Sequence, residues 1–121
     1  MNTASRPATE LTQGRDRIRL LKGRPGWYRL QGMLTFATAA DALRMTRGWL
    51  RPKASIQLDL SGIEHTDSAG IALLLEWLRQ AELVGATINY YHFPLQLETL
   101  IEVNGVDTLI RPAAATAGYW E

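Results

Sequence analysis

The residues best able to do chemistry are concentrated in one short stretch, "GIEHTDSAG", at residues 62–70. It supplies a hydroxyl, an imidazole and carboxylates, the groups of a nucleophilic serine site: Ser68, His65, Asp67 and Glu64. Residues this close on one loop point in divergent directions, and "TDSAG" lacks the glycine two positions before the serine that marks a nucleophile elbow. A hydrolase built on Ser68 is therefore a weak alternative.

Metal and nucleotide sites are equally poorly supported. Glu64, His65 and Asp67 have ligand chemistry, but the other histidine, His92, ends a different segment and no metal-ligand spacing is present. The two separated glycines of "SGIEHTDSAG" have no lysine to meet a phosphate, so this is neither a P-loop nor a dinucleotide fingerprint. We expect no metal, no cofactor, no small-molecule substrate and no enzymatic activity.

The same residues have the pattern of a helix start. Asp67 or Ser68 as N-cap would accept an orphan backbone N–H and, as an acid, favour the positive end of the helix dipole. Such a cap stabilises a helix by ~1 kcal/mol. Ala69 and Gly70 would leave this start open, and glycine in a first turn gives up helix propensity for close approach by another backbone. This combination favours a docking site for another protein.

These residues need strands and helices to position them. The spacing of hydrophobic residues, helix-capping residues and Gly/Pro turn residues predict four strands, at 16–22, 27–32, 55–60 and 86–91. They also predict helices at 35–50, at 68–84 and from Pro94 to the Asn104-Gly105 stop, with a helical turn in 106–112. The order indicates an α/β sandwich in which two crossovers give parallel strands after an initial antiparallel hairpin around "GRPG".

Burial follows from the same periodicity. The helix at 35–50 is expected to have Thr35 or Thr38 as its cap. Its apolar positions predict one buried side, made up of Phe36, Ala39, Ala40, Leu43, Trp49 and Leu50. In the helix at 68–84, Trp77 lies beside the apolar stripe and is expected in the core. Gly85 is expected to be a left-handed C-cap. Residues 1–15 are expected to be a flexible leader and 112–121 a tail.

Composition excludes several classes. At 121 residues, 46% hydrophobic and 21% charged, the chain fits one globular domain. Its net charge is +1 with basic residues spread along the sequence, so we expect no nucleic-acid partner. There is no cysteine and no signal-peptide pattern, and "GIALLL" is far shorter than the ~18 residues of a membrane span. We expect a soluble, cytoplasmic protein.

The segment "IQLDLSGIEHTDSAGIALLLEWLRQAELVGATI" resembles the STAS domain, the fold of anti-sigma factor antagonists and of the cytoplasmic tails of sulfate transporters. The shared pattern is a strand ending in Asp-Leu-Ser, a loop, Asp-Ser-x-Gly, an aliphatic helix, a glycine and a strand. The resemblance implies a STAS domain over 16–111. Its expected fold is a STAS-like α/β sandwich with a mixed sheet of four to five strands, an initial hairpin and three to four helices.

Two departures bear on function. Sigma-regulating members carry Asp-Ser-Ser-Gly, whose second serine is phosphorylated by a partner kinase; here that position is Ala69, and Ser68 aligns with the first serine. The family's Gly-Glu-Leu-Asp corner is Gly32-Met33-Leu34-Thr35. An anti-sigma factor antagonist, with possible phosphorylation of Ser68, is therefore the disfavoured alternative.

The chain is more similar to the small STAS subunits of Mla-type phospholipid ABC transporters of Gram-negative bacteria, whose key segment reads Asp-Thr-Gly-Gly. This resemblance implies a non-enzymatic subunit that binds the transporter's ATPase subunit and is peripheral to the inner membrane through that partner. Ser68 would replace the branch's threonine; Thr35 departs from its acid. The expected partner-binding residues are Thr66, Asp67, Ser68, Ala69, Gly70 and Ile71, with Leu34, Thr35 and Phe36 from the neighbouring corner and Trp77 as a weaker candidate.

Overall fold

The computed structural model describes residues 7–13 and 16–111. A single mixed sheet has the strand order β1-β2-β3-β4-β5, formed by β1 (Pro7–Gln13), β2 (Asp16–Lys22), β3 (Trp27–Leu34), β4 (Ser55–Thr66) and β5 (Thr87–Tyr91). The pairs β1–β2 and β2–β3 are antiparallel, and β3, β4 and β5 are mutually parallel. The predicted mixed sheet with an initial hairpin is confirmed.

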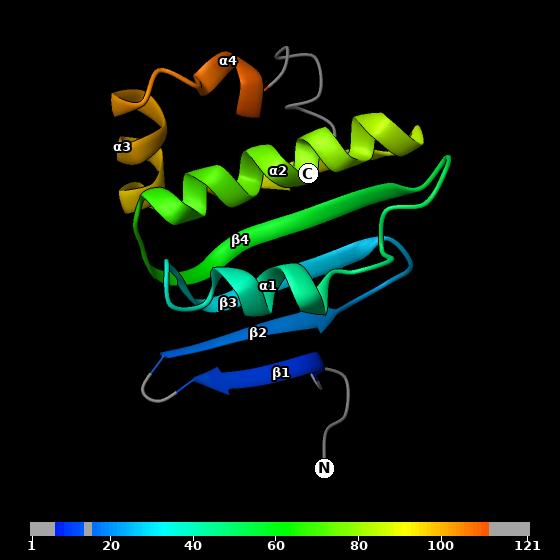
Figure 1. Cartoon of the computed structure of the whole chain (residues 1–121), viewed down its shortest axis with the longest axis horizontal. Coiled ribbons are helices and arrows are strands. Elements are labelled where there is room, and N and C mark those ends of the chain that lie inside the picture. Colours follow the sequence, from blue (N-terminus) through cyan, green and yellow to red (C-terminus); the bar gives the residue numbers. More distant parts are fainter. Residues whose placement is uncertain (1–6, 14–15, 112–121) are drawn as a thin grey trace.

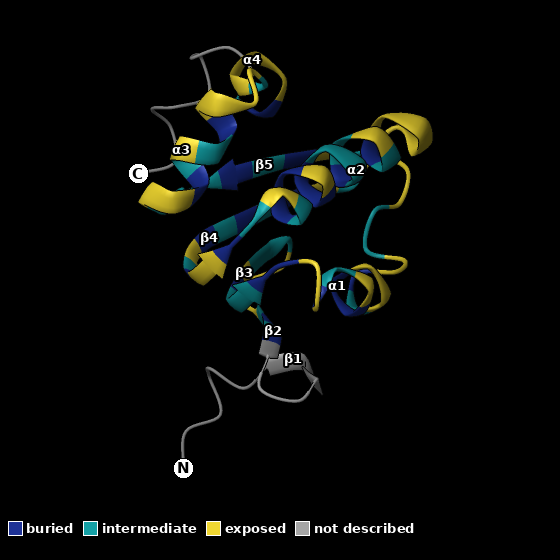
Figure 2. Cartoon of the chain, turned by 60° about the vertical axis from the view of Figure 1, so that its left-hand side comes forward, coloured by how far each residue is buried: buried dark blue, intermediate teal, exposed yellow. Residues whose placement is uncertain are grey.

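Each parallel strand is followed by a helix. These are α1 (Ala39–Met45), α2 (Ser68–Val84) and α3 (Leu95–Val103), with a final short α4 (Asp107–Ile110). Helices α1 and α2 lie across one face of the sheet (Figure 1), and α3 and α4 pack against α2 on the β5 side (Figure 2). Because β3, β4 and β5 run in the same direction, the corners that lead into α1, α2 and α3 all lie at one end of the molecule.

The core lies between the helices and one face of the sheet, as the buried interior in Figure 2 shows. In β4, Ile56, Leu58 and Leu60 are buried, whereas the intervening Gln57 and Asp59 are half-buried on the face away from the helices. Trp77 is fully buried, and its indole Nε1 donates to the Thr46 hydroxyl at 3.0 Å. The expectation that Trp77 belongs to the core is confirmed, which removes it from the partner surface.

The prediction of a leader without secondary structure over residues 1–15 is corrected for Pro7–Gln13, which form β1 against β2. This stretch, "PATELTQ", has no apolar alternation, so its pairing depends on the neighbouring strand rather than on its own pattern. Residues 1–6 and 14–15 and the predicted tail at 112–121 lie outside the described residues.

The helix predicted over 35–50 is shorter and is rotated relative to the expected phase. The hydroxyl of Thr38 accepts from the amide of Thr35 at 3.1 Å and donates to the carbonyl of Met33 at 2.7 Å. These bonds hold residues 35–38 in a turn, because threonine side chains compete with helical backbone bonding. Helix α1 therefore starts after Thr38 and buries Asp41 and Ala42, whereas Phe36 is 81% exposed.

Candidate functional site

The sequence-predicted partner residues come from the first two corners at this end of the molecule, β3 to α1 and β4 to α2. Asp67 joins them. It is the N-cap of α2, and one carboxylate oxygen accepts from the amide of Ala69 at 2.9 Å. The other oxygen accepts from the amide of Phe36 at 3.2 Å. Of the two predicted N-cap candidates, Asp67 and Ser68, the structure has Asp67 as the cap. The second bond of Asp67 also fixes the neighbouring corner.

Several of the predicted partner residues are buried and make contacts within the chain instead. Thr66 is 2% exposed, and its hydroxyl donates to the carbonyl of Leu34 at 2.8 Å. A Cβ on Gly70 would lie 2.2 Å from that hydroxyl oxygen and 3.1 Å from the Leu34 carbonyl oxygen. Gly70 is therefore required by the molecule's own close packing of the two corners, not by the approach of a second protein. The side chains of Leu34, Thr35 and Ile71 are also buried.

The accessible part of the site is a groove between α1 and the start of α2. Its volume is about 530 Å³. Its lining is largely apolar and includes side chains beyond the predicted set: Phe36, Ala39, Leu43, Ser68, Ala69, Ala72, Leu73 and Glu76. Small residues at Ala69 and Ala72, one helical turn apart, leave room along α2. We call this feature the α1–α2 groove.

Two acids, Asp67 next to the α1–α2 groove and Glu76 in its lining, form hydrogen bonds within the chain. Both oxygens of Asp67 accept backbone amides. The carboxylate of Glu76 accepts from the Arg79 guanidinium and from the amide of Gln80, and these bonds lower its pKa to about 2. The α1–α2 groove therefore exposes an apolar surface and the Ser68 hydroxyl, and its carboxylates are already hydrogen-bonded within the chain.

The third corner adds residues that the sequence reasoning missed. The side-chain oxygen of Gln96, in the first turn of α3, accepts from the amide of Thr66 at 3.0 Å and ties α3 to the β4–α2 corner. Next to it Leu95 is 82% exposed. The sequence held a signal for this contact, because Pro94 marks the start of α3. Since β4 and β5 are parallel, the helices that follow them begin at the same end of the molecule.

The candidate nucleophile and its neighbours do not assemble into a catalytic arrangement. Ser68 is exposed at the first turn of α2, and Glu64 and His65 are exposed on β4. Within residues 7–13 and 16–111, no group of three or more His, Cys, Asp or Glu side chains is placed to hold a metal ion.

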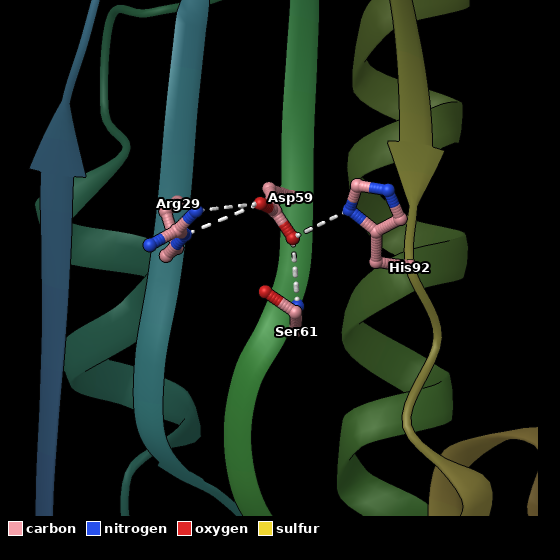
Figure 3. Close-up of polar contacts among 4 residues, drawn as sticks. All are labelled: Arg29, Asp59, Ser61 and His92. Carbon is pink, nitrogen blue, oxygen red and sulfur yellow. Dashed lines mark hydrogen bonds and ion pairs between the residues drawn. The ribbon is translucent and has the colours of Figure 1, made fainter. Parts of the chain in front are cut away.

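A second polar cluster lies on the sheet face away from the helices and was not predicted (Figure 3). Asp59 on β4 accepts from Arg29 on β3 at 3.1 Å and from the backbone amide of Ser61 at 2.8 Å, and lies 3.2 Å from Nδ1 of His92. Burial raises the pKa of Asp59, but the hydrogen bonds from Ser61, His92 and Arg29 outweigh it and hold the pKa below 3.8. This cluster bridges the parallel strands.

Comparisons with known proteins agree with the geometry. A family model described as "Mlab, STAS domain" matches residues 21–111. The intermembrane phospholipid transport system binding protein MlaB of Haemophilus influenzae is 34% identical over 58 residues, which are 48% of this chain and 55% of that protein. The chain thus spans about half the length of this curated relative.

The fold itself recurs in a solved structure. The murine anion transporter Slc26a9, in its inward-facing state, matches 79% of this chain and 16% of its own chain, with a TM-score of 0.57 at 19% identity. No helix in the described part of the present chain is long and apolar enough to cross a membrane. The five-stranded mixed sheet, the Asp67-capped helix and the family match over most of the chain together establish that this chain belongs to the STAS domain family.

Proposed function

We propose that this chain is the STAS subunit that binds the ATPase subunit of an Mla-type phospholipid ABC transporter, peripheral to the inner membrane and without catalysis of its own. The observation that carries the proposal is the open, apolar α1–α2 groove at the start of α2, in a chain that matches an MlaB-type STAS model. The similarity to an MlaB protein of a phospholipid transport system supports the choice of transporter.

Phe36 and Ser68 define how a partner would be held. Phe36 lines the groove and is 81% exposed, and its backbone amide is bonded to Asp67, so the backbone that carries this aromatic side chain is already held in place. Aromatic side chains dominate binding energy at interfaces, and prior ordering reduces the entropy lost on association. Ser68 supplies a hydroxyl in an otherwise apolar lining. The complementary ATPase surface is therefore apolar at its centre.

A subunit of this kind acts by differential binding. It stabilises whichever ATPase conformation presents the complementary surface, and by linkage that conformation binds the STAS subunit more tightly. The expected consequence is a higher ATPase activity or a more stable transporter in the presence of this chain.

Co-purification from the native host with the tagged chain tests the proposal. We expect an ABC ATPase to be recovered with the unmodified chain and to be lost with Ser68→Arg, because the arginine fills the groove. Ser55→Arg is the matched control, since Ser55 is an exposed serine at the opposite end of β4; it should retain the ATPase.

Two results would contradict the proposal. One is recovery of the ATPase with both Ser68→Arg and Ser55→Arg, or failure to recover it with the unmodified chain. The other is stoichiometric phosphate on Ser68, detected by mass spectrometry after incubation with candidate kinases, which would favour an anti-sigma factor antagonist instead.

A further inference from the structure

Exposed basic side chains from three separate segments meet at the end of the molecule opposite the α1–α2 groove. They are Lys22 and Arg24 of the β2–β3 turn, Arg47 after α1, and Arg51 and Lys53 before β4. In the sequence these five residues are dispersed over more than thirty positions. We call the surface that they form the basic end.

Backbone hydrogen bonds fix these segments next to one another. The carbonyl of Gly26 accepts from the amide of Gln57 at 2.7 Å, which places the β2–β3 turn against the start of β4. The amide of Lys53 donates to the carbonyl of Gly85 at 2.9 Å, which joins the preceding turn to the C-cap of α2. Because β3 and β4 are parallel, this end contains their first residues and the groove end contains their last (Figure 1).

The charge of the basic end is one-sided. Within the described residues, Glu82 in the last turn of α2 is the acidic side chain of this corner. Farther from this end, Asp59 and Glu76 are paired with Arg29 and Arg79. The five cations therefore produce a positive local field although the whole chain has a net charge of +1.

Apolar side chains lie beside these cations. Leu83 is 69% exposed and Val84 is 39% exposed at the end of α2. Trp49 and Leu50 line a shallow groove of about 230 Å³ with them. Cations next to exposed aliphatic groups suit the boundary between lipid headgroups and acyl chains.

Nucleic acid suits this surface less well. Binding of single strands depends on aromatic faces on which bases stack. The ring of Trp27 is already stacked on Tyr91 with ring centroids 5.8 Å apart, and the Arg24 guanidinium lies 5.2 Å from its centroid. The ring of Trp49 packs edge-on against Tyr28 and Trp77.

We infer that the basic end binds the headgroups of an anionic phospholipid surface directly. In the sequence the basic residues are spread along the chain, and only the fold brings these five together. The inference does not depend on the ATPase: the surface is complete in the chain alone and lies at the other end from the groove.

Vesicle flotation with the purified full chain tests this inference at low ionic strength. We expect binding to phosphatidylglycerol–phosphatidylcholine vesicles and none to vesicles of phosphatidylcholine alone. The double variant Arg24→Gln/Arg51→Gln should bind on the order of 25-fold more weakly, since each basic residue near an anionic surface contributes a factor of about five. Added salt should release the unmodified chain.

The control Arg24→Lys/Arg51→Lys changes the same two positions without removing their charge and should retain binding, with circular dichroism verifying the fold of both doubles. Equal loss in the two doubles would overturn the inference, as would absence of binding by the unmodified chain or equal binding to neutral vesicles. Binding to single-stranded RNA in place of anionic vesicles would instead identify a nucleic-acid surface.

Discussion

The two ends of the parallel strands use polar groups in opposite ways. At the groove end, the side chains of Asp67 and Thr66 bond to backbone groups, and the large apolar side chains of Phe36 and Leu95 are exposed. At the basic end, tight turns bond their own backbone, and charged side chains extend into solvent. The first backbone N–H groups of a helix have no partner within the helix, so at the groove end nearby polar side chains bond to backbone groups. Side chains used in this way are not available to bind another protein.

Gly70→Ala should break the groove end most strongly. The added Cβ would collide with the Thr66 hydroxyl and the Leu34 carbonyl, and overpacking outweighs the gain in helix propensity to leave a loss of about 2 kcal/mol. Urea denaturation measures the change. Gly23→Ala in the β2–β3 turn is the matched control: its nearest neighbour lies at 3.5 Å, so the change should stay below about 0.5 kcal/mol. Equal losses would refute the packing argument.

Phe36→Ala should weaken ATPase binding about tenfold or more, as expected for an exposed aromatic anchor, with little change in the free energy of unfolding. Leu83→Ala removes a comparably exposed apolar side chain at the basic end and should leave ATPase affinity unchanged. Titration by surface plasmon resonance distinguishes them. If both variants bound like the unmodified chain, Phe36 would not be the anchor.

Asp67→Ala should cost about 1 kcal/mol of stability, since it removes the cap of α2, and should also weaken ATPase binding by freeing the Phe36 corner. Asp67→Asn keeps one acceptor oxygen, so it can keep the Ala69 cap bond but not the Phe36 bond as well, and it should recover only part of the stability. Glu82→Ala, at the other end of α2 and exposed, should be nearly neutral in thermal unfolding. A neutral Asp67→Ala would show that its two hydrogen bonds contribute nothing.

The smallest effect is expected midway between the ends, at Asp59. Its folded pKa lies below the ordinary value of 3.8, so its stabilising contribution is present above pH 3.8 and is lost as the pH falls through the folded pKa. Asp59→Asn should therefore narrow the stability difference between neutral and strongly acidic pH. Parallel denaturation curves across that acidic range test this; an unchanged difference would exclude Asp59 as a contributor.

The sequence pattern predicted α2 well because one helix carries an N-cap, a regular apolar stripe and a glycine C-cap. The bounds 68–84 and the left-handed Gly85, with φ 78°, are confirmed. Helix α1 was placed less well because hydrogen bonds from Thr35 and Thr38 override the local pattern of its first residues. The extension of β4 to Thr66 was missed because register shifts opposite β3 interrupt its alternation.

The sequence predicted which residues of the candidate site lie near one another, but it did not predict which of them are buried. Six residues around "TDSAG" and three from the neighbouring corner do come together, yet burial separates supports such as Thr66 and Leu34 from accessible groups such as Phe36 and Ser68. That separation depends on which side of a corner faces the core. The basic end was missed for a related reason, since its residues are neighbours in space and not in sequence.

The shared carboxylate of Asp67 has a consequence for spectroscopy. The amides of Phe36 and Ala69 are far apart in sequence yet donate to the same side chain. Their proton resonances form a linked pair that should shift together whenever the carboxylate moves, and Asp67→Ala should uncouple them. A bound ATPase that displaced only one corner would shift one resonance and leave the other, so two peaks in an amide spectrum report whether the corners move as a single unit.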